Sequence, residues 1–143
     1  MYENNSSKKI APASLTKLMT ALLLYESNQL NQDIITRLPQ GYTYSGKVAY
    51  LVDGLKVTTE ELLELLLVYS ANDAAYVAAM ELSSDIDNFV DLMNLKAKEL
   101  GMTDTVYLNP DGLDELGHET TLNDLLILTI YIIENTKILD ITS

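Results

Sequence analysis

The sequence predicts a mainly α-helical protein of about five helices with little sheet. Apolar residues recur at the three- and four-residue spacing of a helix face in several long runs, whereas strand-like segments are short. The later apolar runs also begin at Thr, Ser or Asp residues that suit a helix N-cap. Because 48% of the 143 residues are hydrophobic, the chain is long enough to form one domain with a substantial core.

Composition excludes several classes of function. The formal net charge is −12 and only nine residues are Lys or Arg, which argues against nucleic acid or an anionic membrane as a partner. The chain has no cysteine and one histidine, His118, so a disulfide framework and a His/Cys metal site are both excluded, and we expect no cofactor. His118 is expected to be a surface loop residue. No apolar run reaches membrane-spanning length, and the N-terminus lacks the layout of a signal peptide.

The first helix is predicted over residues 11–24. Pro12 suits the first turn of a helix, where a backbone N–H would have no partner. Apolar residues then recur nearly all round the helix, which should therefore be buried. They are Leu15, Leu18, Met19, Ala21, Leu22, Leu23 and Leu24.

Ser14 and Lys17 stand three residues apart near the start of this helix, which brings a hydroxyl and an amine within hydrogen-bonding reach. Lysine can activate a serine only if its pKa falls toward neutrality, and burial and the helix N-terminus both favour the neutral amine. Ser6 and Lys9 have the same spacing, but their polar surroundings would not bury the lysine. The structural alternative is that Ser14 starts the helix and Lys17 is a surface lysine.

Between residues 26 and 54 the sequence predicts mostly irregular structure. A polar break over residues 26–32 precedes a short strand at residues 33–37. Residues 39–54 combine three glycines with three tyrosines and are typical of a loop with short extended pieces. Tyr42, Tyr44 and Tyr50 suit the core, the rim or a substrate groove, and the sequence leaves these alternatives open.

Two further helices meet at a corner. Thr58 and Glu61 have the spacing of a capping box and open a second helix that ends near Tyr69. A third helix of mostly small residues, which allow close packing, covers residues 74–82. Residues 70–72 therefore lie between two helices.

The last two helices are bounded by clear signals. Ser84 and Asp87 are predicted to cap a fourth helix that stops at Gly101. The Asn-Pro-Asp-Gly sequence of residues 109–112 is a turn signature. Thr121, with an aspartate three residues later, then opens a fifth helix.

Two motifs resemble the active-site motifs of penicillin-binding proteins and serine β-lactamases: Ser14-x-x-Lys17 on a buried helix and Ser70-x-Asn72 on a corner between helices. Longer stretches look like a D-alanyl-D-alanine carboxypeptidase and follow that family's order. They are residues 12–20, 69–75, 89–94, 100–102 and 109–113. The resemblance implies that the chain is the helical subdomain of the α/β β-lactamase/transpeptidase-like fold.

The resemblance also implies a role for each motif residue. Ser14 would attack the penultimate D-Ala carbonyl of a peptidoglycan stem peptide, and β-lactam antibiotics would acylate the same oxygen. Lys17 would act as general base, Ser70 would relay a proton to the leaving amine, and Asn72 would bind the substrate amide and hold Lys17 in place. For Ser70 and Asn72 the alternative is plain helix capping. Because family members act outside the cytoplasmic membrane, we expect an exported protein.

The sequence departs from the family at its third motif, Lys-Thr/Ser-Gly on a strand beside the serine. None of the lysines after Ser70, which are Lys96, Lys98 and Lys137, is followed by that pattern. We therefore expect residues 1–143 to be one truncated domain without the family's N-terminal strand and C-terminal sheet portion. In the family, one of the two oxyanion-hole N–H groups comes from the strand that is missing here. Losing one such donor lowers the rate by about 10²–10³, so the chain should be inactive or nearly so. The apolar surface left by the missing sheet would favour self-association.

Two other functions fit parts of the sequence. Glu119, with Leu122 and Asn123, matches the Glu-x-x-Leu-Asn stretch of class A β-lactamases, whose glutamate activates the deacylating water. Thr121 is better explained as a helix cap, which weakens this match. The non-enzymatic alternative is a helical interaction module in which Ser14 and Lys17 are structural.

Overall fold

Helix α1 (Thr16–Ser27) lies at the centre of a mainly helical chain, of which a computed structural model describes residues 4–143. A 3-10 turn, η1 (Ala13–Leu15), leads directly into α1. The other helices are α2 (Thr59–Leu67), α3 (Asn72–Leu82), α4 (Ile86–Leu100), α5 (Leu122–Asn135) and α6 (Ile138–Ile141). The mainly α fold is confirmed, and the short α6 is an addition to the five predicted helices.

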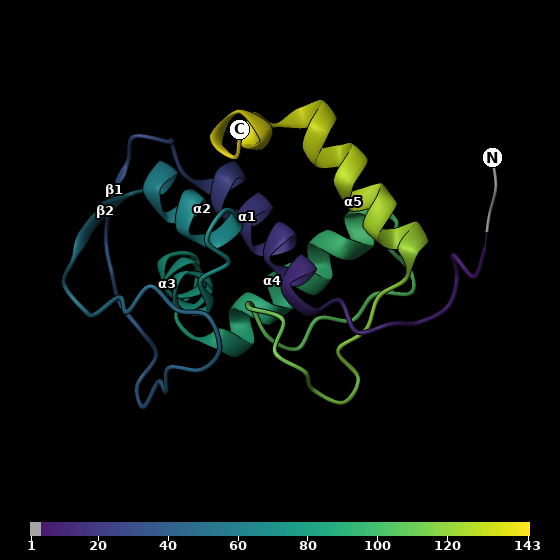
Figure 1. The fold of residues 1–143 in the computed structure, drawn as a ribbon, viewed down its shortest axis with the longest axis horizontal. Helices are drawn as coiled ribbons and strands as arrows, with labels where there is room; N and C mark the ends of the chain where they lie inside the picture. Colours follow the sequence, from purple (N-terminus) through teal and green to yellow (C-terminus); the bar gives the residue numbers. More distant parts are fainter. Residues whose placement is uncertain (1–3) are drawn as a thin grey trace.

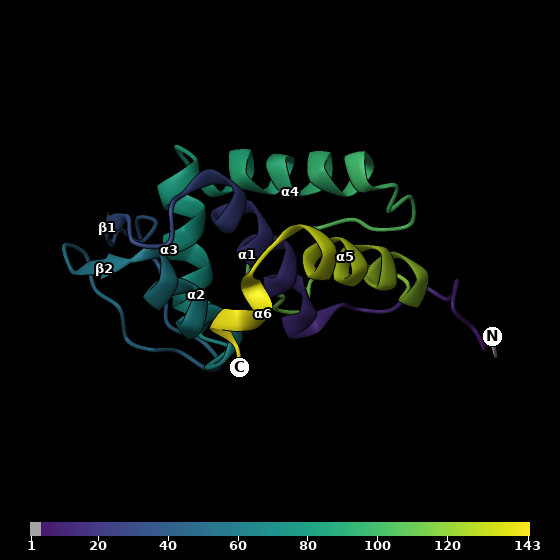
Figure 2. The ribbon, with the colours of Figure 1, turned by 90° about the horizontal axis from the view of Figure 1, so that it is seen from above.

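The core has two halves that share α1. Helices α2 and α3 lie on one side of α1, and α4 and α5 lie on the other (Figure 1, Figure 2). Ala21 and Leu24 face the first half, whereas Met19 and Leu22 face the second. All four side chains are fully buried. Apolar side chains on both sides of α1 therefore stabilise both halves of the core, since each fully buried Leu or Met contributes roughly 1.5–3 kcal/mol of transfer free energy.

A two-stranded antiparallel sheet flanks α2. Strands β1 (Asp33–Ile35) and β2 (Lys56–Thr58) pair with Ile34 opposite Val57. Thr58 ends β2 and caps α2, since its side chain accepts from Glu61 N and the Glu61 carboxylate accepts from Thr58 N at 2.7 Å. The predicted capping box is confirmed. Strand β2 was not predicted, because three residues carry no local pattern and depend on pairing with β1.

The connection between the strands is an irregular loop, as predicted, and α3 holds it in place. Asp73, in the first turn of α3, is fully buried and accepts from Ala49 N at 2.9 Å and Leu51 N at 2.8 Å. Earlier in the loop, the half-buried Tyr42 ring packs against Tyr76 of α3, with ring centroids 4.9 Å apart. These contacts attach the loop to the helical body.

Helix α4 begins next to its predicted cap. Asp85, rather than Ser84 or Asp87, accepts from the backbone N of Asn88 at 2.8 Å. All three residue types can cap a helix, so the correction reflects a choice that only the path of the chain makes. At the other end, Gly101 adopts a left-handed conformation with φ +83°, as predicted.

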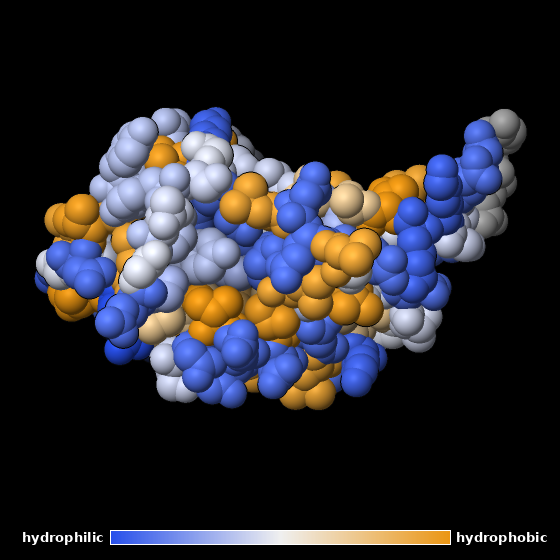
Figure 3. All heavy atoms as spheres, turned by 90° about the horizontal axis from the view of Figure 1, so that it is seen from below, coloured by the Kyte–Doolittle hydropathy of each residue, from blue (hydrophilic) through white to orange (hydrophobic). Residues whose placement is uncertain are grey.

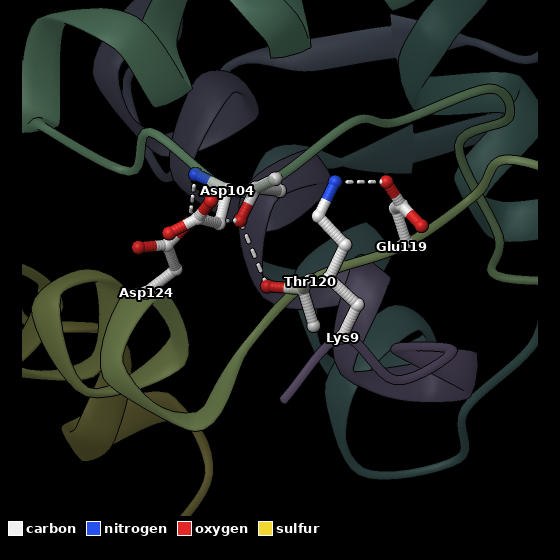
Figure 4. A network of polar contacts seen from close by, with 6 residues as sticks. Lys9, Asp104, Glu119, Thr120 and Asp124 are labelled. Carbon is white, nitrogen blue, oxygen red and sulfur yellow. Dashed lines mark hydrogen bonds and ion pairs between the residues drawn. The ribbon is translucent and has the colours of Figure 1, made fainter. Parts of the chain in front are cut away.

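A polar network joins the N-terminal segment, the loop after α4 and the start of α5 (Figure 4). The Asp124 carboxylate accepts from Asp104 N at 2.9 Å and from the Thr105 hydroxyl at 2.7 Å. Beside this group, Lys9 forms an ion pair with Glu119. These contacts hold residues 119–121, which lead into α5, beside the N-terminal segment that leads into α1; Ile10 and Thr120 pair there as an isolated antiparallel bridge.

Within residues 4–143, no helix has the length and apolar character needed to cross a membrane. The same residues contain no group of three or more acidic, histidine or cysteine side chains that could hold a metal ion. Figure 3 shows hydrophobic and hydrophilic side chains interleaved across one face, with a mostly hydrophilic N-terminal segment projecting from the body.

Candidate active site

Ser14 lies on the 3-10 turn that precedes α1, and its side chain is exposed. Pro12 starts the turn, and its carbonyl oxygen accepts from Leu15 N at 3.1 Å. Between them Ala13 has φ +48°, a left-handed conformation that L-residues rarely adopt. Backbone strain of this kind persists only where surrounding contacts hold it, and such strain clusters at functional sites.

Lys17 is only 2% exposed, which confirms a buried lysine one turn after Ser14. Its Nζ donates to the backbone oxygen of Asp111 at 2.7 Å. Burial lowers the pKa of Lys17 below its usual 10.5, and the nearby negative charge of Asp111 opposes part of this shift. Among the described residues there is no hydrogen bond between Ser14 Oγ and Lys17 Nζ, so the expected direct bond between them is not formed here. Catalytic hydrogen bonds are often looser before substrate binds.

A groove of about 470 Å³ brings Ser14, Lys17 and Ser70 together. Ser70 lies on the corner between α2 and α3, as predicted, with φ +58°. The remaining wall is largely apolar and consists of Pro12, Ala13, Leu15, Leu18, Leu66 and Leu67. The groove therefore combines two hydroxyl groups, one buried amine and an apolar wall.

Asn72 lies beside the groove and does not line it. As the first residue of α3 it is 6% exposed, and its Nδ2 donates to the Ser45 backbone oxygen at 2.8 Å. Its backbone N donates to the Lys47 oxygen at 2.7 Å. A Cβ at Gly46 would approach Asn72 Nδ2 to 2.7 Å, so the loop fits closely over the amide. Asn72 thus holds the loop, while Lys17 is held by Asp111.

The loop at residues 108–118, which we call the clamp loop, contacts the turn that carries Ser14. Gly112, at φ +88°, packs so closely that a Cβ there would lie 1.9 Å from the Ala13 carbonyl oxygen. Thr20, one turn into α1, donates to the Pro110 oxygen at 2.7 Å. The Asn-Pro-Asp-Gly signature predicts this turn, but its docking on α1 has no signal in the sequence.

The expectation for His118 is wrong, because the side chain is only 4% exposed. Nδ1 accepts a hydrogen bond from Leu108 N at 2.8 Å, and Nε2 lies 2.8 Å from Thr16 Oγ1. A ring nitrogen that accepts carries no proton, so the imidazole is neutral and its Nε2–H donates to Thr16. Burial lowers the pKa of His118, in agreement with this neutral form. Sequence reasoning missed this residue, since a lone histidine in a polar loop resembles a surface residue.

Glu119 is not among the residues that line the groove. Its carboxylate forms the ion pair with Lys9, and its backbone pairs with Val106. Thr121 accepts from Asp124 N at 3.2 Å and caps α5, as expected. This geometry does not favour the deacylating glutamate of a class A β-lactamase.

A serine ahead of a buried lysine at the start of a central helix, with a second serine on the neighbouring corner, defines the helical portion of a transpeptidase-like fold. A structure of the D-alanyl-D-alanine carboxypeptidase DacD from Francisella tularensis superposes on this chain with a TM-score of 0.92 and 30% sequence identity. The match covers 99% of this chain and 36% of that one. The ampicillin-bound penicillin-binding protein D2 from Listeria monocytogenes matches with a TM-score of 0.77 and 30% identity, over 93% of this chain and 56% of that one.

The chain belongs to the D-alanyl-D-alanine carboxypeptidase family, whose sequence model matches residues 1–142. It is 36% identical over 132 residues to the D-alanyl-D-alanine carboxypeptidase DacF from Bacillus subtilis, a match that covers 90% of this chain. The chain spans about a third of the length of the curated relatives it matches, 34% in the case of DacF.

Proposed function

We propose that this chain carries the nucleophile half of a serine-type D-Ala-D-Ala carboxypeptidase site that acts on peptidoglycan stem peptides. The observation that carries the proposal is the groove in which exposed Ser14, buried Lys17 and Ser70 meet. Family membership supports the substrate class, and the family's role in peptidoglycan chemistry supports a site of action outside the cytoplasmic membrane.

The proposed reaction moves one proton and one acyl group. Neutral Lys17 takes the hydroxyl proton of Ser14 as Oγ bonds to the penultimate D-Ala carbonyl carbon. The C–N bond to the terminal D-Ala then breaks, and Ser70 passes the proton from Lys17 to the leaving amine. In the second step a water oxygen bonds to the acyl carbon, its proton passes back through Lys17 to Ser14 Oγ, and the C–Oγ bond breaks to release the shortened peptide. Asn72 lies beside the groove and its Nδ2 is held by Ser45, so Oδ1 is the atom proposed to bind the substrate amide at the edge of the groove.

The same groove is proposed to bind β-lactams. The penicillin-binding protein D2 structures are described in ampicillin-bound and cefotaxime-bound forms, and both match this chain at 30% identity or above. A β-lactam carbonyl would acylate Ser14 Oγ by the route described for the peptide. No cofactor enters this chemistry.

Residues 1–143 are proposed to form one helical part of the peptidase domain and to react slowly on their own. The Lys-Thr/Ser-Gly motif is not among these residues, and in the family its strand supplies one of the two oxyanion-hole donors. Removing one such donor typically lowers the rate by about 10²–10³. We therefore expect slow acylation by β-lactams and no measurable release of D-Ala from a stem peptide.

Fluorescent penicillin and intact-protein mass spectrometry test this proposal. The chain should form one slow adduct, which Ser14→Ala abolishes. Ser6→Ala is the matched control, because Ser6 and Lys9 repeat the Ser-x-x-Lys spacing outside the groove, and it should label like the unmodified chain. Labelling that survives Ser14→Ala would contradict the nucleophile assignment. Rapid stoichiometric labelling would instead contradict the expected near-inactivity.

A longer protein tests the activity proposed for the whole enzyme. The 143 residues can be joined to the remaining segments of the Bacillus subtilis relative, which is 36% identical over the matched region. This protein should release D-Ala from a D-Ala-D-Ala peptide, and Lys17→Met should reduce the rate by about 10²–10⁴, the usual contribution of a general base. A Lys17→Met protein with full activity would exclude Lys17 as the base.

The exposed face of α5 supports a second function, self-association. Four large apolar side chains lie along one face of the helix and are 44–52% exposed. They are Leu122, Leu126, Ile130 and Ile133. If this face mediates association, sedimentation should show a dimer that Leu126→Lys with Ile130→Lys converts to a monomer, whereas a monomer at all concentrations would exclude it.

A further inference from the structure

The clamp loop makes three polar contacts with the first two turns of α1. His118 bonds to Thr16, Asp111 accepts from Lys17, and Pro110 accepts from Thr20. The last two use backbone oxygens, which nearly any residue would supply. The contact between His118 and Thr16 is the only one of the three that depends on the side chain of the loop residue.

Thr16 occupies a sensitive place between the two proposed catalytic groups. It follows Ser14 by two residues and precedes Lys17 by one, and its own side chain is completely buried. Because Ser14 is exposed and stands on a turn with a left-handed residue at Ala13, contacts from outside the turn have to fix its direction. A hydrogen bond at Thr16 acts on both neighbours at once.

The imidazole of His118 is itself held from the opposite side. Leu108 N donates to Nδ1 at 2.8 Å, which orients the ring and directs Nε2–H toward Thr16. The Tyr107 ring lies edge-on to the imidazole, with 5.9 Å between ring centroids. The ring thus links two backbone segments that are far apart in the sequence, with a defined donor and acceptor.

We propose that His118 is a positioning residue for the acylation of Ser14, acting through its Nε2–H···Oγ1 hydrogen bond to Thr16. The inference rests on the proposed function, because it assigns His118 to the orientation of the same Ser14 and Lys17. His118 does not touch the reacting atoms. It holds the first turn of α1, so that Ser14 and Lys17 both line the groove.

Two substitutions at His118 separate positioning from simple loop support. His118→Gln places an amide N–H near the position of Nε2 and keeps the bond to Thr16, but loses the acceptor for Leu108 N. His118→Asn places an amide oxygen near the position of Nδ1 and keeps the Leu108 bond, but loses the donor to Thr16. A loop-supporting role predicts equal acylation rates or an advantage for Asn, whereas the positioning role predicts an advantage for Gln.

The measurement is the rate of Ser14 acylation by fluorescent penicillin in the 143-residue chain, followed by intact mass. We expect His118→Asn to slow acylation by about 10- to 100-fold, since small displacements of reacting groups cost up to about 10²-fold. His118→Gln should stay within about threefold of the unmodified chain on the same basis. Urea unfolding of both variants gives the folded fraction, so that rates are compared per folded molecule.

A double-mutant cycle with Thr16→Val isolates the hydrogen bond. Thr16→Val should slow acylation in the unmodified chain and have little further effect in His118→Asn, because both changes remove the same bond. Additive effects, or equal rates per folded molecule in the Asn and Gln variants, would overturn the positioning role while leaving Ser14-dependent acylation intact. An unmodified chain that forms no Ser14 adduct would overturn the proposed function, and this inference with it.

Discussion

The two halves of the groove are held in place by different kinds of contact. The start of α1, directly after the turn that carries Ser14, is fixed by Asp111 and His118, which lie 94 and 102 residues from their partners in the sequence. The corner that carries Ser70 is fixed by a loop much closer in sequence, since Asn72 bonds to Ser45 across 27 residues. The position of the nucleophile side therefore depends on contacts between distant segments of the chain. The position of the corner side depends on contacts between α3 and the loop that connects β1 and β2.

This difference predicts that substitutions in the clamp loop will lower both the acylation rate of Ser14 and the free energy of unfolding. Substitutions at the corner should disturb the loop over Asn72 and leave the start of α1 largely unchanged. Three changes test the comparison, in order of decreasing expected effect.

Gly112→Ala should have the largest effect. The new Cβ would lie 1.9 Å from the Ala13 oxygen, and Gly112 has φ +88°, so either the clamp loop or the turn before Ser14 must move. We expect a loss of about 3 kcal/mol or more in the free energy of unfolding, measured by urea denaturation, from overpacking and left-handed strain together. Gly41→Ala is the control, because it also has positive φ but nothing within 4 Å, and it should lose only about 1 kcal/mol. Equal losses of unfolding free energy in the two variants would show that the close contact with Ala13 does not contribute to stability.

Asp73→Asn should have an intermediate effect, confined to the corner. The buried carboxylate accepts from Ala49 N and Leu51 N, and an amide can replace only one of these acceptors. We expect a loss of about 1–3 kcal/mol, the range for a buried donor left without a partner. Hydrogen exchange should rise at residues 45–51 and remain unchanged at residues 16–20. Increased exchange at the start of α1 would contradict the independence of the two sides.

The pH dependence of stability should show the smallest effect, on the nucleophile side. Burial lowers the pKa of His118 from 6.5, while Glu115, Asp111 and Asp114 partly oppose the shift. Protonation therefore favours the unfolded chain, so the contribution of His118 is complete above about pH 6.5 and is lost as the pH falls below this value.

The difference in free energy of unfolding between the unmodified chain and His118→Gln isolates this contribution from that of Asp111. Burial raises the pKa of Asp111, so its contribution runs in the opposite direction. The difference should be flat above about pH 6.5 and should shrink on acidification. A difference that does not change with pH would contradict the neutral, buried imidazole.

The helices could be predicted largely because their signals are local. Thr58 and Thr121 cap α2 and α5 as expected, and Gly101 ends α4. Where several residues carry the same signal, as Ser84, Asp85 and Asp87 do, the sequence does not choose among them. Strand β2 escaped prediction for a related reason, since it exists only through its pairing with β1.

The sequence by itself determined the candidate nucleophile and its buried lysine, because apolar periodicity predicts the burial of α1 and Ser14 and Lys17 lie within one turn. The resemblance of ordered motifs then indicated the family, to which the chain belongs. Only the tertiary structure decided what surrounds the pair: Lys17 bonds to Asp111, Asn72 bonds to Ser45, and His118 is buried against Thr16. The physical reason is that these contacts join polar groups far apart along the chain, and their partners are set by the packing of helices rather than by any local pattern of residues.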